Sequence, residues 1–477
     1  MNTKEMKSSV GLPEKWDDEA DVVIIGSGFA GLAAALEAKN AGSSVIILEK
    51  MKSPGGNSKI SGGVVSAAGS KLQAEQGIED STDSLLDDML KAGLSLNHLE
   101  LAQMVASESK EILQWTIDYL GVEYNKLIHF GGHSVPRSCY TYNKCGSAIV
   151  YPQIKKLKEA GVEVQTESYL NKLIVDSYGR VRGVQIREGY RFPDENSGVV
   201  KHINAKKAVI LATGGFSNDI FFRTIQNPSL TDEVMSTNQP GATAEALLEA
   251  LSIGATLVQP SCIQLGPWTS PDEKGFGTAP HFVAAVVFQY GIMIDPATGK
   301  RFVNELADRE IRTRAIIKNA HPCIGIADMK GAEGMEDKTK KLISRGVVKQ
   351  FNSIKELAKE YEIPFNNLNE TIKNYNSYIQ GGEDKDYGKY LQKDVNPIKE
   401  PFYAVRIWPK VHHTMGGLQI NTKAQVIGLD KEPIKGLYAA GELTGGVHGA
   451  VRLGGCAVID CLLFGRIAGK NAAAEKS

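Results

Sequence analysis

One strand–helix–strand pattern near the N-terminus constrains the fold of this chain more than any other feature. The segment 21–25, an aspartate followed by four apolar residues, is typical of a buried strand, and Gly26-x-Gly28-x-x-Gly31 follows it directly. An alanine-rich helix comes next, and a second apolar run then ends in Glu49. This order of parts predicts a Rossmann-like dinucleotide-binding unit within an α/β domain.

Each residue of this motif has a physical role in binding a dinucleotide. Gly26 permits a tight turn, Gly28 lets the backbone approach a pyrophosphate, and Gly31 lets the helix pack closely on the strand. The helix N-terminus directs its partial positive charge at the phosphates, and Glu49 can accept a hydrogen bond from a ribose hydroxyl. The alternative is a chance glycine-rich turn, which would need neither the preceding strand nor the acid that ends the second strand.

The composition argues against several classes of partner. The 477 residues suffice for two or three domains, and 54 Lys and Arg balance 55 Asp and Glu to give a net charge of −1. We therefore expect neither nucleic acid nor an anionic membrane surface as the main partner. The longest apolar runs are too short to span a bilayer, so we expect no membrane insertion.

Two features bear on the cellular compartment. The first residues have neither the apolar stretch nor the paired arginines of an export signal, so we expect a cytoplasmic protein, or a periplasmic one if a signal was removed. The six cysteines do not form Cys-x-x-Cys or a haem-attachment motif, which predicts reduced structural thiols and no metal site. They are Cys139, Cys145, Cys262, Cys323, Cys456 and Cys461.

Several later segments resemble one family of flavoproteins. Gly55–Gly63 resembles the second phosphate and flavin loop of the fumarate reductase and succinate dehydrogenase flavoproteins. The segments 299–310, 412–417 and 445–455 match the flavocytochrome c fumarate reductases and the related methacrylate, acrylate and urocanate reductases. The resemblance covers nearly the whole chain from residue 20. It implies a Rossmann-like FAD-binding domain with an inserted α+β capping domain that closes over the flavin, here without a haem domain.

The resemblance also implies the state of the cofactor. Family members that attach FAD covalently carry a histidine in the loop equivalent to Gly55–Gly63, and this loop has none. Non-covalent FAD is therefore implied. The chain has no second complete Gly-x-Gly-x-x-Gly unit, so we expect no separate NAD(P)H domain.

The expected domain organisation has four segments. Residues 1–19 form a polar lead-in, and 20–260 form the first part of the FAD-binding domain. The pattern becomes less regular after residue 260, so we place the capping and substrate domain at 261–411. Residues 412–477 return to the FAD-binding domain through a strand that ends in Gly-Glu.

The family pattern assigns the expected FAD contacts residue by residue. Glu442 resembles the acid that meets the flavin ribityl chain, and the turn at Thr213 and Gly214 passes near the adenosine half. The full set of expected cofactor-binding residues is Gly26, Gly28, Gly31, Glu49, Gly56, Asn57, Ser58, Ser61, Gly62, Gly63, Thr213, Gly214, Thr237, Asn238, Gly241, Ala242, Thr243, Gly417, Glu442, Leu453 and Gly454.

Three residues are the expected catalytic groups. By position in the family pattern, Arg309 matches the proton donor, and His412 and Arg452 match residues that hold a substrate carboxylate. In this chemistry flavin N5 gives a hydride to one alkene carbon, and the other carbon needs a proton. Charge-assisted hydrogen bonds from Arg452 and His412 would polarise the alkene. Arginine scarcely deprotonates, so Arg309 would need a relay that returns its proton.

Simpler interpretations of these residues stay open. Arg309 could be a surface ion-pair partner, and His412 could be a structural histidine. His413 and His448 are better explained as structural or supporting groups.

The chain departs from a fumarate reductase at two places. Gly266 stands where an Ile-Gln-x-His-Pro segment would have its histidine, and the apolar run 284–288 stands where a Thr-Glu pair is expected. Burying a second carboxylate without these partners would cost roughly several kcal/mol. We therefore predict an α,β-unsaturated monocarboxylate, such as an acrylate- or methacrylate-like acid or an aryl-acrylate, as the substrate. Candidate pocket residues, which could equally be ordinary core, are Trp268, His281, Phe282, Phe288 and Tyr290.

The electron supply and two other functions stay open. Many relatives carry a haem or FMN domain, but this chain has no Cys-x-x-Cys-His. We expect a separate electron donor, such as a c-type cytochrome or a flavoprotein, in anaerobic respiration. The first alternative is a flavin-dependent ketosteroid or enone dehydrogenase or reductase. The second is a non-catalytic flavoprotein subunit for electron transfer.

Overall fold

The computed structural model describes residues 11–329 and 336–476, and the first ten residues of the predicted lead-in lie outside this range. The chain divides into two compact units. Unit 1 comprises Met1–Thr231, Gln239–Ile263 and His413–Ser477, and unit 2 comprises Asp232–Asn238 and Gln264–His412. The predicted inserted segment, 261–411, therefore differs from unit 2 by a few residues at each end and by the short stretch 232–238.

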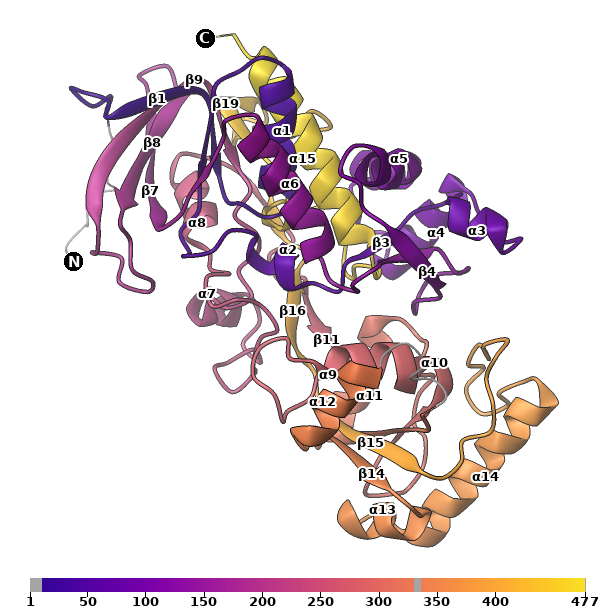
Figure 1. Cartoon of the computed structure of the whole chain (residues 1–477). Helices are drawn as coiled ribbons and strands as arrows, with labels where there is room; N and C mark the ends of the chain where they lie inside the picture. The colour runs from indigo at the N-terminus through magenta and orange to yellow at the C-terminus, as the bar shows by residue number, and fades with distance from the viewer. Residues whose placement is uncertain (1–10, 330–335, 477) are drawn as a thin grey trace. The chain divides into compact units, whose positions relative to one another are not determined.

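A mostly parallel sheet forms the centre of unit 1 (Figure 1). Its strand order is β18-β19-β9-β1-β2-β6, and β8 joins β7 to β9 at the side of this path. The strands are β1 (Asp18–Ile25), β2 (Val45–Leu48), β6 (Val164–Gln165), β7 (Ser168–Val175), β8 (Val181–Glu188), β9 (Val199–Leu211), β18 (Gln425–Ile427) and β19 (Pro433–Ala439). Ile25 pairs in parallel with Leu48 on one side and with Leu211 on the other. The predicted Rossmann-like α/β fold is confirmed.

Helices cover this sheet because its central strands are apolar on both faces. The helices α1 (Phe29–Asn40), α6 (Ser147–Glu159) and α15 (Cys456–Ala474) lie side by side in Figure 1. Glycines let α15 approach α1 closely. A Cβ at Gly465 would lie 2.4 Å from the Ala30 carbonyl oxygen, and one at Gly469 would lie 2.2 Å from that of Ala34. The C-terminal helix thus packs on the helix of the N-terminal motif.

The remaining elements of unit 1 surround this core. A three-stranded sheet has the order β3-β5-β4. The elements are α2 (Gly56–Ile60), β3 (Val64–Ser66), α3 (Lys71–Glu75), α4 (Thr82–Ala92), α5 (Leu99–Asp118), β4 (Tyr124–Ile128), β5 (Ser138–Thr141), α7 (Ile220–Gln226), α8 (Glu245–Ser252), β10 (Leu257–Val258), β17 (Gly417–Leu418) and the 3₁₀ turn η3 (Gly441–Leu443). Two further strands, β11 (Ile263–Gly266) and β16 (Lys410–Thr414), pair with each other where the chain passes from one unit to the other.

Unit 2 is an α+β structure built on a four-stranded antiparallel sheet of order β12-β13-β15-β14. Its strands are β12 (Ile292–Ile294), β13 (Cys323–Ala327), β14 (Val348–Phe351) and β15 (Phe402–Ile407). Its helices are α9 (Ala279–Phe282), the π-helix η1 (Val283–Val287), α10 (Phe288–Tyr290), α11 (Arg309–Lys318), α12 (Glu336–Ser344), α13 (Ile354–Glu360) and α14 (Phe365–Gly381). Two hydrophobic clusters pack between the sheet and these helices.

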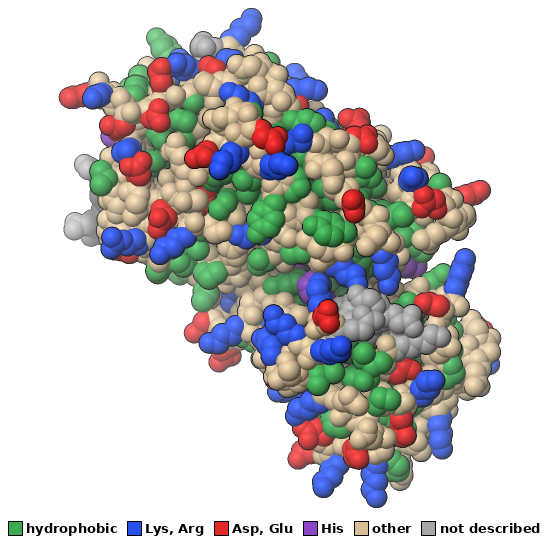
Figure 2. All heavy atoms as spheres, viewed as in Figure 1, with side chains coloured by type: hydrophobic (Ala, Val, Ile, Leu, Met, Phe, Trp, Pro, Cys, Tyr) green, Lys and Arg blue, Asp and Glu red, His purple; other side chains and the backbone are tan. Residues whose placement is uncertain are grey.

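The surface reflects the balanced composition. On the face shown in Figure 2, Lys and Arg side chains are interspersed with Asp and Glu on both units. No helix in the described residues is long and apolar enough to cross a membrane. All six cysteines lie in the described ranges, and none of them is in a disulfide.

Candidate functional site

A cavity in unit 1 lies at the carboxyl ends of the parallel strands. The residues that follow β1, β2 and β9 line it, together with the start of β7 and the turn after β19. It encloses about 960 Å³, part of which is open to solvent. Open α/β sheets bind their ligands at this edge of the sheet.

The glycine-rich turn after β1 brings the start of α1 to this cavity. Gly26 has φ +101°, and a Cβ there would lie 2.3 Å from the Ala212 carbonyl oxygen. A Cβ at Gly31 would lie 2.0 Å from the Gly26 carbonyl oxygen. Any side chain at either position would therefore separate the helix from the strand. The N-cap residue of α1 is Gly28, which has no side chain to cap the first backbone N–H groups.

A second segment, around α2, contacts the same turn and also lines the cavity. Ser58 in α2 accepts a hydrogen bond from the Phe29 N–H at 2.9 Å, and Asn57 accepts one from the Gln239 N–H at 2.7 Å. The N-cap residue of α2 is Gly55, which also supplies no side-chain acceptor. The N-cap residues of both helices are thus glycines without a side-chain acceptor, although Ser58 accepts from the first N–H of α1. The partial positive charges of these two N-termini suit a diphosphate.

Glu49 places a buried carboxylate at the end of β2. Its Oε2 accepts hydrogen bonds from the Ser27 hydroxyl at 2.6 Å and the Ser27 N–H at 3.2 Å, and its Oε1 accepts one from the Met51 N–H at 3.0 Å. A carboxylate has about four acceptor sites, so Glu49 retains capacity for a ribose hydroxyl. The cavity thus fits the phosphates and the ribose of a dinucleotide such as FAD.

The predicted cofactor residues divide into those that line this cavity and those that do not. The lining set is Gly26, Gly28, Glu49, Gly56, Asn57, Ser58, Thr213, Gly214, Gly241, Ala242, Thr243 and Glu442. The others are Gly31, Ser61, Gly62, Gly63, Gly417, Leu453 and Gly454 in unit 1 and Thr237 and Asn238 in unit 2. Gly31 and Gly63 pack against backbone: a Cβ at Gly63 would lie 2.5 Å from the Cys145 carbonyl.

A buried polar cluster surrounds Glu442 at the edge of the cavity. Its Oε1 accepts a hydrogen bond from the Thr414 N–H at 3.0 Å and lies 3.3 Å from His413 Nδ1. Burial raises the pKa of Glu442 to about 7, and the nearby charge of Arg452 opposes this rise. His448 forms a separate pair with Asp460, with Nε2 and Oδ2 3.1 Å apart. His413 and His448 thus both pair with buried carboxylates.

Arg452 lies in the glycine-rich segment before α15. Its side chain is buried, and Nη1 donates to the Leu453 carbonyl at 2.9 Å. Burial lowers the pKa of Arg452. A desolvated guanidinium of this kind can form strong, charge-assisted bonds with a carboxylate.

In unit 2, Arg309 begins α11 and is held by two side chains. Asp308 caps the helix by accepting from the Ile311 N–H at 2.9 Å. The Arg309 Nη1 donates to Gln264 Oε1 at 2.8 Å, and the guanidinium carbon lies 4.5 Å from the centre of the Trp268 ring. The guanidinium therefore has a defined orientation.

A buried ion cluster fixes the segment that leads to Arg309. The guanidinium of Arg301 forms bidentate pairs with Glu305, at 3.0 and 2.7 Å, and with Asp384, at 2.8 and 2.9 Å. All three side chains are almost fully buried, and Lys389 lies 3.7 Å from Glu305. Because Glu305 is four residues before Arg309, this cluster limits the movement of the start of α11.

His412 lies in the same part of unit 2 as Arg309. Its Nδ1 is 2.8 Å from the Thr237 hydroxyl, and its backbone carbonyl accepts from the Asn238 side chain at 3.0 Å. Trp268 contacts His412 edge to face with 5.0 Å between ring centres, while also stacking on Arg309. Unit 2 thus brings together two of the three predicted catalytic residues, and Arg452 belongs to unit 1.

Trp268 occupies the space where the family pattern expects a histidine. A Cβ at Gly266 would lie 3.3 Å from the Trp268 indole and 3.5 Å from the His412 Cβ. The second departure from the family pattern, 284–288, covers most of the π-helix and the first residue of α10, and its last three residues are in the hydrophobic core of unit 2. Apolar groups therefore occupy both places where the family pattern expects polar side chains, at Gly266 and at 284–288.

The other predicted pocket residues have different surroundings. His281 contacts Phe276 edge to face at 5.7 Å, and Phe276 also lies 6.3 Å from His412. The structure places Phe282 and Phe288 in the core instead, where they are 0% and 3% exposed because the helices pack on the sheet there. The Tyr290 hydroxyl donates to Asp394 at 3.2 Å.

Sequence reasoning missed Gln264 and Phe276. Gln264 follows Ile263 in the segment used for the resemblance, but its bond to Arg309 depends on two elements far apart in the sequence. Phe276 lies in an irregular loop without periodicity. Glu273 fixes this loop by accepting from the Thr278 and Ala279 N–H groups at 2.8 and 2.7 Å.

Three comparisons with known proteins bear on this site. The family model described as FAD binding domain matches residues 21–458. The chain is 42% identical to the acrylate reductase flavoprotein subunit of Shewanella woodyi, covering 96% of this chain and 92% of that protein. It is 33% identical to the urocanate reductase of Eggerthella lenta, covering 99% of this chain and 77% of that protein. A solved structure of the open conformation of a flavocytochrome c3 fumarate reductase has a TM-score of 0.76 and 32% identity, covering 96% of this chain and 79% of that chain.

Proposed function

Because the chain belongs to the FAD binding domain family, we propose that it is an FAD-dependent reductase of the C=C bond of an α,β-unsaturated monocarboxylate. The observation that carries the proposal is the apolar indole of Trp268 beside Gly266, next to Arg309 and His412. The similarity to an acrylate reductase flavoprotein subunit over almost the full length of both chains supports it. Fumarate would be a poor substrate.

Residues of unit 1 would hold the cofactor. The N-termini of α1 and α2 would face its diphosphate, and Glu49 would accept a hydrogen bond from its ribose. When bound and reduced, FAD supplies a hydride to one carbon of the substrate alkene. Glu442, in the lining of the same cavity, would meet another polar part of the cofactor.

Arg452 and His412 would bind the substrate carboxylate. Negative charge moves toward the carboxylate when a hydride adds to the distal alkene carbon, so cationic hydrogen-bond donors lower the energy of that charge. The Thr237 hydroxyl fixes the His412 ring through Nδ1. We therefore assign Thr237 to orienting His412 rather than to contacting FAD.

Arg309 would give a proton to the second alkene carbon. Gln264 and Trp268 orient its guanidinium, and the buried cluster of Arg301, Glu305 and Asp384 fixes the start of its helix. Arginine holds its protons tightly, so the proton must pass as the substrate gains electron density and must be replaced through other groups.

Trp268 gives the physical reason for preferring a monocarboxylate. Beside His412 and Arg309, the substrate would meet the indole ring of Trp268 at Gly266 rather than a second hydrogen-bond donor. A small apolar end loses nothing there, whereas a second carboxylate would lose its hydration without gaining a partner.

Electrons would reach the flavin from a separate protein, such as a c-type cytochrome or another flavoprotein. The similar protein from Shewanella woodyi is named a flavoprotein subunit, which supports a donor on another chain. A cytoplasmic location stays a prediction from the sequence.

FAD is expected to bind without a covalent link, because the loop Gly55–Gly63 contains no histidine. Denaturing the purified protein in acid should release FAD into the supernatant. Flavin fluorescence that migrates with the polypeptide on a denaturing gel would contradict this expectation.

The substrate preference can be measured through anaerobic oxidation of a reduced viologen by the FAD-loaded protein. Acrylate, methacrylate, cinnamate and urocanate would be compared with fumarate, with a simple enone that lacks a carboxylate as the control. We expect kcat/KM for the best monocarboxylate to exceed that for fumarate by roughly tenfold or more, because an unpaired, buried carboxylate costs roughly several kcal/mol. Comparable turnover of fumarate would contradict the role of Trp268, and turnover of the enone alone would favour an enone reductase.

Replacing Arg309 by Gln should lower kcat by roughly 100-fold or more, the usual contribution of a positioned acid, with little change in KM or in bound flavin. Arg314→Gln is the matched control, because Arg314 is on the same helix but is exposed and pairs only at the surface with Glu310. A kcat within a few-fold of the original for Arg309→Gln would remove Arg309 from the proposed chemistry.

A further inference from the structure

The backbone carbonyl of Gly454 joins the Arg452 segment to a buried part of unit 1 that the proposed reaction does not use. This oxygen accepts two hydrogen bonds, from the Ser66 hydroxyl at 2.8 Å and from His133 Nε2 at 2.9 Å. Gly454 is two residues after Arg452, and Gly455, the N-cap residue of α15, has φ +78°. The two bonds therefore hold the backbone immediately after Arg452.

This segment needs such bonds because it is rich in glycine. Gly446, Gly449 and Gly455 all have positive φ. Glycine has no Cβ and adopts positive and negative φ about equally readily, so these residues do not by themselves restrict the backbone. A guanidinium in a flexible segment would reach the substrate carboxylate in many orientations. Hydrogen bonds from fixed side chains restrict those orientations.

The surroundings of His133 determine its protonation state. The side chain is buried, its Nε2 faces the Gly454 carbonyl, and its Nδ1 lies 3.3 Å from Arg137 Nη1. A carbonyl only accepts and a guanidinium only donates, so His133 carries its proton on Nε2 and accepts at Nδ1. Burial and the charge of Arg137 lower the pKa of His133 to about 3. It is therefore neutral at physiological pH.

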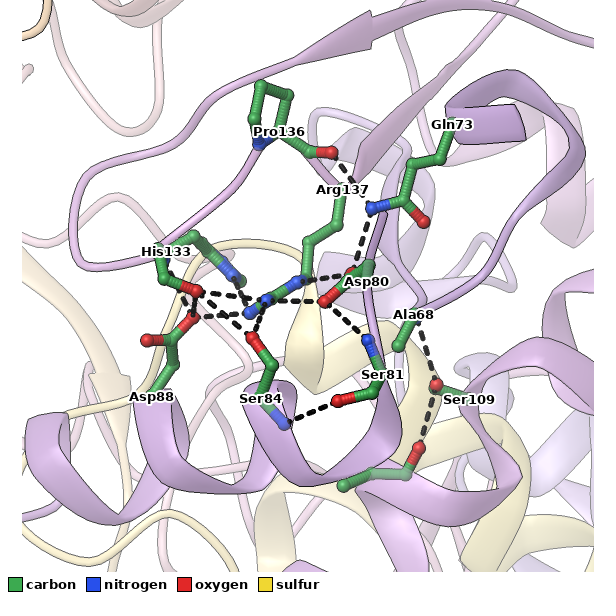
Figure 3. A network of polar contacts seen from close by, with 12 residues as sticks. Ala68, Gln73, Asp80, Ser81, Ser84, Asp88, Ser109, His133, Pro136 and Arg137 are labelled. Carbon is green, nitrogen blue, oxygen red and sulfur yellow. Dashed lines mark hydrogen bonds and ion pairs between the residues drawn. The ribbon is translucent and has the colours of Figure 1, made fainter. Parts of the chain in front are cut away.

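Arg137 is itself held on all sides, as Figure 3 shows. Its guanidinium donates to Asp80 at 2.9 and 2.8 Å and also pairs with Asp88. It further donates to Ser84 at 3.0 Å and to Ser134 at 3.2 Å. The Arg137 side chain is fully buried. Its ion pairs and hydrogen bonds therefore hold Arg137 and its partners, the Arg137 cluster, rigidly within unit 1.

Resting on the proposed function, we propose that His133 is a positioning residue for Arg452. His133 contacts the buried Arg137 cluster through Nδ1 and donates to the Gly454 carbonyl through Nε2. These two contacts restrict the backbone beside Arg452 and so hold Arg452 in the orientation that binds the substrate carboxylate. Its neutral Nε2–H tautomer is the form that can donate to Gly454 while accepting from Arg137.

The proposal predicts a specific effect of His133→Leu in the FAD-loaded full-length protein. Backbone amides of residues 452–456 should exchange their hydrogens at least about tenfold faster than in the original protein. Binding of propionate, followed as a change in the flavin absorption spectrum, should weaken about tenfold, while the flavin content stays the same. His133→Gln keeps a donor near the position of Nε2 and should recover most of both effects.

Two controls keep the test decisive. His202→Leu removes a partly buried histidine on β9 and should change neither measurement. If His133→Leu does not fold or loses flavin, His133→Gln and His133→Asn are compared instead, since the shorter Asn donor cannot reach Gly454.

The outcomes separate this proposal from the proposed function. Unchanged exchange at 452–456 in His133→Leu, or equal exchange in the Gln and Asn variants, overturns the positioning role. Faster exchange with unchanged propionate affinity also overturns it, because the bond would then be structural only. If the original protein binds no carboxylate at all, the proposed function fails, while the exchange data still test the bond between His133 and Gly454.

Discussion

The nucleotide site depends on one close backbone contact, between the first turn of α1 and the Gly26 turn that follows β1. Gly31 permits it, since a Cβ there would lie 2.0 Å from the Gly26 carbonyl oxygen. This contact directs the N-terminus of α1 into the cavity at the strand ends. α15 then packs on α1 through Gly465 and Gly469, so the C-terminal segment that carries Arg452 is built onto the N-terminal motif.

The local parts of this site could be predicted from the sequence because they depend on residues close together in the chain. The motif from Gly26 to Glu49 predicted the βαβ unit and the acid at the end of β2, and the similarity to acrylate and urocanate reductases confirms the family resemblance. Contacts between distant segments could not be predicted. The contact between the Thr237 hydroxyl and His412 joins residues 175 positions apart, and no local motif marks it. No periodicity marked Phe276.

The proposed preference for monocarboxylates follows from the packing of Trp268 against Gly266 in unit 2. Gly266 has no side chain, and the indole of Trp268 lies against it while stacking on Arg309. In the proposed site, Gly266 offers no donor for a second carboxylate, and Trp268 orients the proposed proton donor Arg309. Neither position lines the cofactor cavity of unit 1.

The central claim is that one carboxylate of the ligand is bound, through Arg452, and that no second one is. Spectral titration of the oxidised, FAD-loaded protein with propionate and with succinate tests this claim without turnover. We predict saturable binding of propionate, binding of succinate weaker by roughly tenfold or more, and loss of propionate binding in Arg452→Met with FAD retained. Tighter binding of succinate, or propionate binding unchanged by Arg452→Met, would contradict it.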